Sequence, residues 1–223
     1  MPPIGDRYAP FPAKPQDNWI VFGSGYKQKM GDEIQGIPAM AAEFEERYRN
    51  VARIDLRRWD DNWDDLAEWI FRRCSSIENI KLLCICYSWG VGFGFRKFAK
   101  ACRKRGILIS GAVLSDPVAH LGIRFCHRIG LSQAAAFWPP RSPCFKCARR
   151  LRLWLPDNIN KEKTYWFTQE NSLLRGHDLY WSDTKELAQN KMVLKFRTHT
   201  YMDEAPEFRR RAIDLADELF GSA

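Results

Sequence analysis

The sequence predicts an α/β fold with a mostly parallel central sheet flanked by helices, and three observations lead to this class. Segments of strand and helix character alternate from residue 18 to residue 114. The segment 80–87 is apolar at nearly every position except Lys81, as expected for a strand that is covered on both faces. The chain has 223 residues, enough for one domain with a substantial core.

The elements can be assigned in chain order. We expect an extended arm over 1–17, which is rich in proline and polar residues, and a single domain over 18–223. Strands are expected at 18–23, 51–56, 80–87, 107–114, 164–168 and 192–196. Helices are expected at 38–48, 62–73, 90–105 and 205–220, with Asn62 as the N-cap of the second.

After Asp116 the alternation stops, and a basic insertion is expected at about 118–160. Its residues 118–156 include seven basic side chains and no acidic one, namely Arg124, Arg128, Arg141, Lys146, Arg149, Arg150 and Arg152. Most of the excess behind the formal net charge of +8 lies here. Such a field attracts anionic ligands or an anionic membrane face, and added salt weakens it. A solvated cationic face without a dedicated partner is the alternative.

Cysteine usage predicts neither a disulfide framework nor a metal site. The chain has seven cysteines, an odd number, and three of them fall on expected core elements, where cysteine packs as a small hydrophobe. Cys144 and Cys147 form one Cys-x-x-Cys, which would bind zinc only if Cys126 and His127 completed it. We expect reduced thiols in the insertion instead, with no metal and no cofactor.

The composition is that of a globular protein, with 45% hydrophobic and 28% charged residues. No apolar run approaches the roughly 20 residues of a membrane-spanning helix. The first residues lack the charged start, apolar run and cleavage site of a secretory signal. We therefore expect a cytoplasmic protein without a transmembrane segment.

The most informative segment is 82–94, Leu-Leu-Cys-Ile-Cys-Tyr-Ser-Trp-Gly-Val-Gly-Phe-Gly, in which a strand enters Ser88 and a helix follows. A turn this sharp crowds the positions two before and two after the serine, and Cys86 and Gly90 are small enough for them. The amino end of the following helix would direct its amides at the same spot, where they would stabilise an oxyanion. The alternative is a buried serine that closes a tight turn.

This segment resembles the nucleophile elbow of α/β-hydrolases, Gly-x-Ser-x-Gly, with Cys86 in place of the first glycine. The resemblance extends over about 19–219, because Ser88, Asp116 and His199 follow one another in the family's order of nucleophile, acid and histidine. It implies an α/β-hydrolase fold in which the insertion occupies the place of the family's cap. The implied activity is that of a serine hydrolase, which cleaves a carboxylic ester or thioester through an acyl-enzyme intermediate.

A serine nucleophile needs a base, and four histidines compete for this role. His199 directly follows the last expected strand, so it would lie at the carboxyl edge of the sheet, which also holds Ser88. His177 lies in a polar segment, and His120 and His127 lie in the insertion with no strand edge to position them. We therefore expect His199 to be the base.

The acid is expected to be Asp116, which ends the strand after the elbow helix, one strand over from Ser88. The Asp-Pro-Val that it begins resembles a subset of α/β-hydrolases that carry the acid in this place. Glu170 and Asp178 are alternatives, because the family most often carries the acid one strand later. Asp203 is expected to belong to the start of the last helix, where a negative charge suits the helix dipole.

The oxyanion hole would combine the amide of Trp89 with an amide of Ser24 or Gly25, since Phe-Gly-Ser-Gly-Tyr resembles the family's oxyanion loop. A plain turn at the end of a strand is the alternative for this loop. The insertion would shape specificity through its arginines and aromatic side chains, and we expect substrate contacts from Phe137, Trp138 and Arg124. The expected partner is a small-molecule or lipid-like acyl substrate with an apolar acyl part and an anionic remainder.

Two other functions remain open. The protein could be an inactive, hydrolase-like binding module that docks through its basic insertion. Nucleic acid is not favoured as its partner, because the aromatic residues are mostly spaced as core residues. Alternatively, Gly-Val-Gly-Phe-Gly at 90–94, with Asp116 at the end of the next strand, imitates a dinucleotide-binding turn, although the third glycine is misplaced. The sequence defines no oligomeric state.

Overall fold

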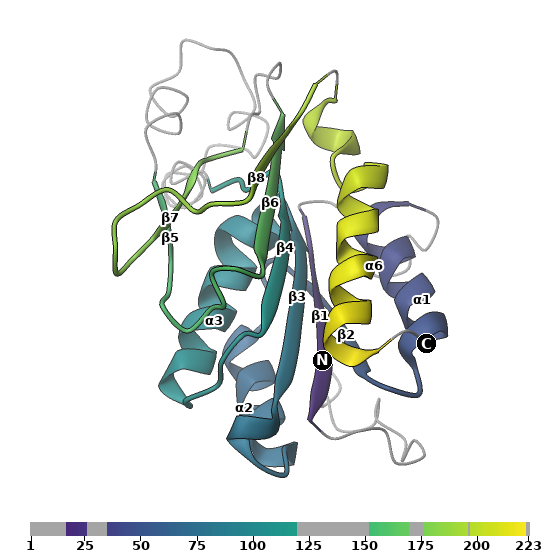
Figure 1. Ribbon diagram of the computed structural model, residues 1–223, viewed down its shortest axis with the longest axis vertical. Helices are drawn as coiled ribbons and strands as arrows, with labels where there is room; N and C mark the ends of the chain where they lie inside the picture. Colours follow the sequence, from purple (N-terminus) through teal and green to yellow (C-terminus); the bar gives the residue numbers. More distant parts are fainter. Residues whose placement is uncertain (1–16, 26–34, 120–151, 170–175, 196, 222–223) are drawn as a thin grey trace, which may run out of the picture.

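A parallel sheet forms the centre of the computed structural model, which describes residues 17–25, 35–119, 152–169, 176–195 and 197–221. Within these residues the sheet has six strands in the order β2-β1-β3-β4-β6-β8, and every neighbouring pair is parallel (Figure 1). The strands are β1 Asn18–Ser24, β2 Arg53–Arg58, β3 Lys81–Tyr87, β4 Gly111–Ser115, β6 Thr164–Gln169 and β8 Lys191–Leu194. The predicted α/β class with a mostly parallel sheet is confirmed.

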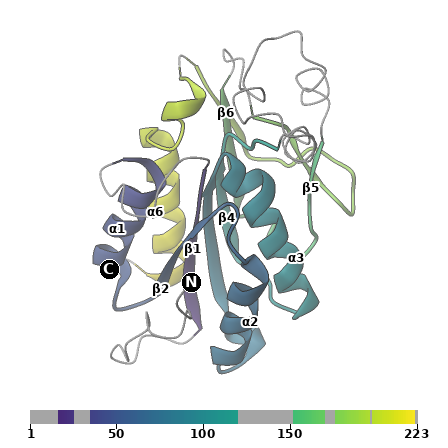
Figure 2. The ribbon, with the colours of Figure 1, turned by 180° about the vertical axis from the view of Figure 1, so that it is seen from behind.

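Helices cover both faces of the sheet. The helices α1 (Gly36–Tyr48) and α6 (Pro206–Phe220) lie on one face, and α2 (Trp63–Arg73) and α3 (Arg96–Lys104) lie on the other (Figures 1 and 2). Successive side chains of a strand point to opposite faces. Accordingly, Ile20 and Phe22 of β1 pack with α1 and α6, whereas Trp19 and Val21 pack with α2.

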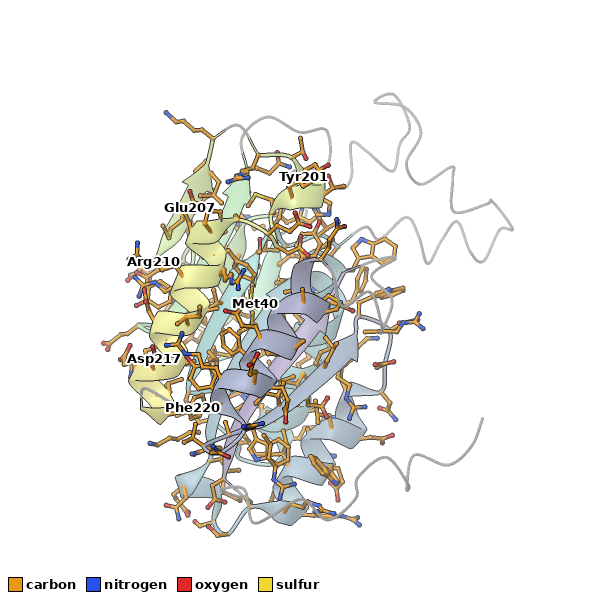
Figure 3. All side chains as sticks on the ribbon, turned by 90° about the vertical axis from the view of Figure 1, so that its right-hand side faces the viewer. Met40, Tyr201, Glu207, Arg210, Asp217 and Phe220 are labelled. Carbon is orange, nitrogen blue, oxygen red and sulfur yellow. The ribbon has the colours of Figure 1, made fainter. Side chains whose placement is uncertain are left out.

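The layer of α1 and α6 is held by polar contacts at its outer end as well as by its apolar side. The Tyr48 hydroxyl at the end of α1 donates to the Asp217 carboxylate of α6 over 2.7 Å. Arg47 forms an ion pair with the same carboxylate at 2.8 Å. Figure 3 looks at this layer, with Met40 of α1 beside α6 and Asp217 near the end of α6.

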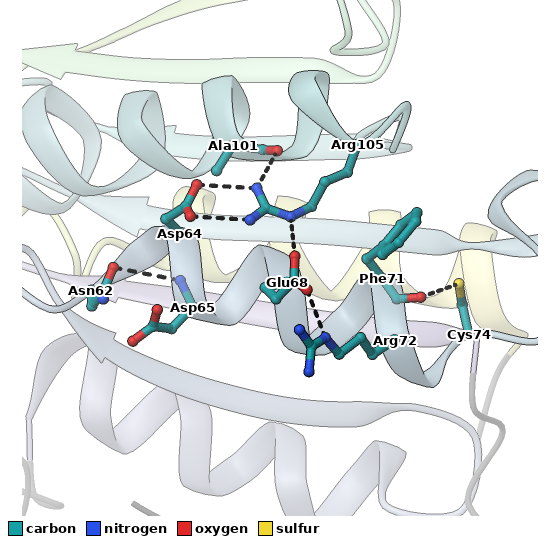
Figure 4. A network of polar contacts seen from close by, with 9 residues as sticks. All are labelled: Asn62, Asp64, Asp65, Glu68, Phe71, Arg72, Cys74, Ala101 and Arg105. Atoms are coloured by element: carbon teal, nitrogen blue, oxygen red, sulfur yellow. Dashed lines mark hydrogen bonds and ion pairs between the residues drawn. The ribbon is translucent and has the colours of Figure 1, made fainter.

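The layer of α2 and α3 is joined by Arg105, which directly follows α3. Its guanidinium forms ion pairs with Asp64 at 3.0 Å and Glu68 at 2.9 Å, both on α2, and Glu68 also pairs with Arg72 (Figure 4). Asn62 accepts a hydrogen bond from the amide of Asp65, so the predicted N-cap of α2 is confirmed.

Two short strands differ from the sequence-based expectation. The strands β5 (Leu153–Leu155) and β7 (Leu179–Trp181) pair in parallel as a separate two-stranded sheet. Three residues are too few to show a period, and β5 lies within the segment that we expect to be irregular. Short strands of this kind are therefore defined by their partner rather than by their own pattern.

Several observed limits differ by one or two residues from those expected, as for β2 and β8, and two elements differ more. The strand expected at 107–114 joins the sheet only from Gly111, because Ile109 pairs with Ile159 outside the sheet. Burial of Ile107 and Ile109 accounts for the apolar pattern without sheet pairing. The helix expected at 90–105 begins as a π-helical segment, η3 (Gly90–Phe95), and continues as α3. A π-helical turn within a helix is often found at a functional site.

The chain leaves β1 and β3 in opposite directions at the carboxyl edge of the sheet. These strands are neighbours, but β1 leads to α1 on one face and β3 leads through η3 to α3 on the other face. Ligands of open parallel sheets bind at such topological switch points. The turn after β3 contains Ser88, and the turn after β1 contains Gly25.

None of the helices in the described part of the chain is long and apolar enough to cross a membrane.

We predict that Arg105→Gln lowers stability at neutral pH, because it removes both ion pairs between α2 and α3. Hydrogen bonds from Arg105 lower the pKa of Asp64 and of Glu68 below their ordinary values of 3.8 and 4.5. Stabilisation by these groups is complete above those ordinary values and is lost as the pH falls below them. The difference in Tm between the wild type and the variant should therefore be largest near pH 7 and shrink below about pH 4.5.

Thermal unfolding across pH tests this prediction, and the difference should also shrink in high salt. The matched control is Lys100→Gln, at an exposed position of α3 that forms no ion pair within the described residues. A pH-independent difference in Tm would contradict the assignment.

Candidate active site

Ser88 lies in a strained turn between β3 and η3. Its φ is 55°, in the left-handed region that side chains other than glycine rarely adopt. The turn is held by backbone hydrogen bonds, because the Ser88 amide donates to the Ser115 carbonyl at 2.9 Å and its carbonyl accepts from Gly92 at 3.0 Å. The side chain is 3% exposed. The predicted strand, turn and helix around Ser88 are confirmed.

The small residues around Ser88 are required by close packing between β1, β3 and η3. A Cβ at Gly90 would lie 2.2 Å from the carbonyl oxygen of Gly23, so no larger residue fits. On the other side of the serine, Cys86 is paired in register with Gly23, and a Cβ at Gly23 would lie 2.7 Å from the Cys86 Sγ. A cysteine is thus accommodated at 86 because its neighbour in β1 is a glycine.

Ser88, His199 and Asp116 form one hydrogen-bonded chain. The Ser88 Oγ lies 2.9 Å from His199 Nε2, and His199 Nδ1 lies 2.5 Å from Asp116 Oδ2. An ionised carboxylate only accepts hydrogen bonds, so Nδ1 carries the proton and donates it to Asp116. In the neutral ring Nε2 is then the acceptor for the Ser88 hydroxyl. Three residues that are distant in the sequence therefore meet at the carboxyl edge of the sheet.

Asp116 is fully buried and tightly held. Its φ is 42°, a second left-handed residue at the end of a strand next to β3. The carboxylate accepts hydrogen bonds through Oδ1 from the Gly176 amide at 2.7 Å and from the Thr168 hydroxyl at 3.5 Å. Its Oδ2 contacts His199 Nδ1 and also accepts from Gln169 Nε2 at 3.4 Å. A Cβ at Gly176 would lie 2.4 Å from Oδ1. Gly176 is a site residue that the sequence analysis misses, because a single glycine in a polar segment carries no sign of its distant partner.

The competing acids have other contacts. Asp178 forms an ion pair with Lys191 at 2.7 Å, and Glu170 lies outside the described residues. Asp203, which we expect at the start of α6, lies three residues before Pro206 and also reaches the start of another helix. Asp203 is buried, and its carboxylate accepts from the Ile37 amide in the first turn of α1 at 3.2 Å. A carboxylate stabilises a helix start through the dipole, whichever segment supplies it.

Of the other histidines, only His177 lies in the described part of the chain, since His120 and His127 fall outside it. The His177 amide donates to the Pro117 carbonyl at 2.6 Å, which places His177 beside Asp116 rather than at Ser88. Burial lowers the pKa of the His177 imidazole below its ordinary value, against the opposing effects of the Ala119 backbone and of Asp116. His177 therefore belongs to the wall behind Asp116.

The turn after β1 approaches the serine closely. A Cβ at Gly25 would lie 2.9 Å from the Tyr87 ring and 3.1 Å from the Ser88 Cβ. The Ser24 hydroxyl is buried and has no hydrogen-bond partner among the described residues. Trp89 follows Ser88 at the amino end of η3, the end from which helical amides point outward.

Three aromatic rings cluster beside this turn. The Trp89 ring contacts Trp59 at 4.6 Å and Phe93 at 5.9 Å between centroids. Trp59 follows β2 at the carboxyl edge of the sheet, and Phe93 belongs to η3. Trp89 is buried, whereas Trp59 and Phe93 are partly exposed. An apolar surface thus lies next to the residue that follows Ser88.

Several predicted residues cannot be placed. The expected substrate contacts Phe137, Trp138 and Arg124 lie outside the described residues, as do Cys126, His127, Cys144 and Cys147 of the alternative zinc site. Within the described residues no group of three or more potential ligands could hold a metal ion, and the four cysteines there are free thiols. The alternative of a dinucleotide-binding turn at 90–94 would need space for a pyrophosphate beside its second glycine. A Cβ at Gly92 would lie 1.9 Å from the Val118 carbonyl oxygen, so protein atoms already fill this space.

Comparisons with known proteins give only distant similarity. No family model and no curated protein matches the chain. The RedJ thioesterase from the prodiginine biosynthetic pathway of Streptomyces coelicolor is 15% identical, with a TM-score of 0.44 over 96% of this chain and 92% of that one. The Vlm2 thioesterase domain, bound with a dodecadepsipeptide, is 14% identical, with a TM-score of 0.39 over 94% and 97%. Similarity at this level does not define an activity, so the function has to be inferred from the geometry of the site.

We predict that Gly176→Ala lowers the reactivity of Ser88 towards a fluorophosphonate by about 100-fold, because the new methyl group displaces Asp116 and with it His199. The rate of covalent labelling measures the effect. The control is Gly106→Ala, where a Cβ would contact nothing within 4 Å but φ is 73°. That variant should lose about 1 kcal/mol of stability and label at the wild-type rate. Equal labelling rates for both variants would contradict the role of Gly176.

Proposed function

We propose that the protein is a serine hydrolase of the α/β-hydrolase type, with Ser88 as nucleophile, His199 as base and Asp116 as acid. The observation that carries the proposal is the hydrogen-bonded chain of 2.9 Å and 2.5 Å that ends on a serine in left-handed conformation. Backbone strain of this kind costs about 1–3 kcal/mol and persists at functional sites. The position at a topological switch point supports the same conclusion.

The mechanism follows from the direction of the hydrogen bonds, in which Ser88 donates to His199 and His199 donates to Asp116. His199 Nε2 takes the proton of Ser88 while Oγ attacks the carbonyl carbon of an ester or thioester. The protonated imidazole, stabilised by Asp116, then gives this proton to the leaving alcohol or thiol, and an acyl-enzyme remains. Water attacks the acyl carbon with His199 again as base, and Ser88 regains its proton as the acid is released.

The oxyanion of each tetrahedral intermediate needs donors that are already in place. We assign the amide of Trp89 as one donor, because it lies at the amino end of η3. The second is an amide of Ser24 or Gly25, whose turn packs against Tyr87 and Ser88. The Ser24 hydroxyl adds a buried donor to the same turn. Glycine at 25 allows the backbone to approach the serine, where a side chain would intrude.

The substrate class follows from the surroundings of the turn. We place the apolar acyl group against Trp59 and Phe93, whose partly exposed rings flank Trp89. The positive charge of the insertion suits an anionic remainder, as in lipids or acyl carriers. No step of this mechanism uses a metal or cofactor.

We predict that Ser88→Ala lowers the hydrolysis rate of p-nitrophenyl acetate by roughly 10⁴-fold or more, because it removes the nucleophile. Circular dichroism should show an unchanged fold, since the substitution removes only the Oγ of Ser88 and keeps its Cβ. Ser182→Ala, in the turn after β7, is the control and should keep full activity. An unchanged rate for Ser88→Ala would favour the alternative, a hydrolase-like module that only binds its ligand.

We predict that Trp59→Ala and Phe93→Ala reduce kcat/KM more for long acyl chains than for acetate. The lost apolar contact costs about 1–3 kcal/mol only when the acyl chain is long enough to reach it. Rates with p-nitrophenyl acetate, hexanoate and decanoate measure the selectivity. A proportional loss with all three esters would show that the rings support the fold instead of binding the acyl group.

A further inference from the structure

Tyr87, which directly precedes Ser88, contacts His199 in two ways. Its hydroxyl donates to the backbone carbonyl of His199 at 2.5 Å. Its ring also stacks against the imidazole, with 5.2 Å between centroids and an interplanar angle of 28°. The hydrogen bond fixes the chain at His199, and the stacking restricts rotation of its ring.

Ser115, which directly precedes Asp116, makes a corresponding contact with the segment that begins at His199. Its hydroxyl is buried and donates to the Met202 carbonyl at 3.1 Å. The neighbours of the nucleophile and of the acid thus each donate a side-chain hydroxyl to a backbone carbonyl. The two carbonyls are those of His199, the first residue of the 3₁₀ turn His199–Tyr201 (η5), and of Met202, the residue that follows the turn.

In the described part of the chain the turn is also held by the two residues that follow it, because Met202 is buried in the core and the Asp203 carboxylate accepts from the Ile37 amide at 3.2 Å. The internal backbone hydrogen bonds of the turn run from Tyr201 to Thr198 at 3.0 Å and from Met202 to His199 at 3.3 Å, and neither connects it to the sheet. The preceding strand β8 ends at Leu194, and among the described strands it pairs only with β6. Figure 1 shows the turn as the short helix above α6, on the side of the sheet that α6 covers.

We propose that Tyr87 and Ser115 are positioning residues that hold His199 at hydrogen-bond distance from Ser88. Two attachment points on one short turn fix both its position and its orientation, so that the imidazole reaches Ser88 and Asp116 together. An error of about 1 Å in such an arrangement can cost 100-fold in rate. This proposal rests on the proposed function, in which His199 is the base.

The Tyr87 hydroxyl keeps its proton throughout the working pH range. Burial raises the pKa of Tyr87 far above its ordinary value, and the carboxylates of Asp203, Asp116 and Glu204 raise it further. The hydroxyl therefore acts as a permanent hydrogen-bond donor.

Four single variants and the double variant Tyr87→Phe/Ser115→Ala test the proposal. Tyr87→Phe keeps the stacked ring and removes the hydroxyl, Ser115→Ala removes the second hydroxyl, and Ser115→Thr retains it. Tyr201→Phe is the matched control, because Tyr201 lies in the same turn but is 57% exposed. The measurements are kcat and KM with p-nitrophenyl acetate, and the downfield proton resonance of the His199–Asp116 hydrogen bond.

Loss of one hydroxyl should lower kcat by about 10-fold, the equivalent of one hydrogen bond, and change KM by less than 2-fold. The downfield resonance should broaden or disappear in Tyr87→Phe and Ser115→Ala, and remain in Ser115→Thr and Tyr201→Phe. The double variant should lose less than the product of the two single effects, because both hydroxyls hold the same turn.

An intact resonance together with unchanged kcat in both single variants would overturn the proposal. A lower Tm with an intact resonance would do the same, because the hydroxyls would then only stabilise the fold. If Tyr87→Phe does not fold, Ser115→Ala and Ser115→Thr still decide the question. Failure of the proposed function is recognised separately, by wild-type activity in Ser88→Ala with the resonance present.

Discussion

The left-handed backbone at Ser88 and Asp116 is the constraint on which the rest of the site depends. Both residues end adjacent parallel strands, and each is held by hydrogen bonds to the next strand in the sheet, Ser88 to Ser115 and Asp116 to Phe167. Left-handed conformation costs about 1–2 kcal/mol for each such residue. The hydrogen bonds to the sheet stabilise this conformation. As a result, the side chains of Ser88 and Asp116 both point to the same place at the carboxyl edge.

Packing against the strand ends explains why the surrounding residues are small. Gly90 makes room for the carbonyl of Gly23, and Gly176 makes room for the Asp116 carboxylate. The same logic accounts for Cys86, which departs from the glycine of the α/β-hydrolase pattern. Its side chain uses the space that Gly23 leaves in the neighbouring strand. The requirement for small residues therefore applies to the pair of strands and not to one position in the motif.

The position of His199 has a different origin from those of Ser88 and Asp116. The strand ends hold the serine and the aspartate directly, whereas the histidine lies on a three-residue turn that follows the edge strand β8 in the chain. Contacts from Tyr87 and Ser115 connect this turn to the same two strand ends. All three members of the proposed triad are thus held by the carboxyl ends of β3 and β4, which are buried.

The sequence by itself determined the α/β class, most of the strands and helices, and the turn at Ser88, because hydrophobic period and small residues are local signals. Chain order and strand ends also selected Asp116 and His199 as candidates. Only the tertiary structure decided the partners of Gly176, Tyr87, Ser115 and Asp203, the pairing of β5 with β7, and the limit of β4 at Gly111. These features depend on contacts between residues that are distant in the chain, and no local pattern of side chains encodes which distant group will fill a given space.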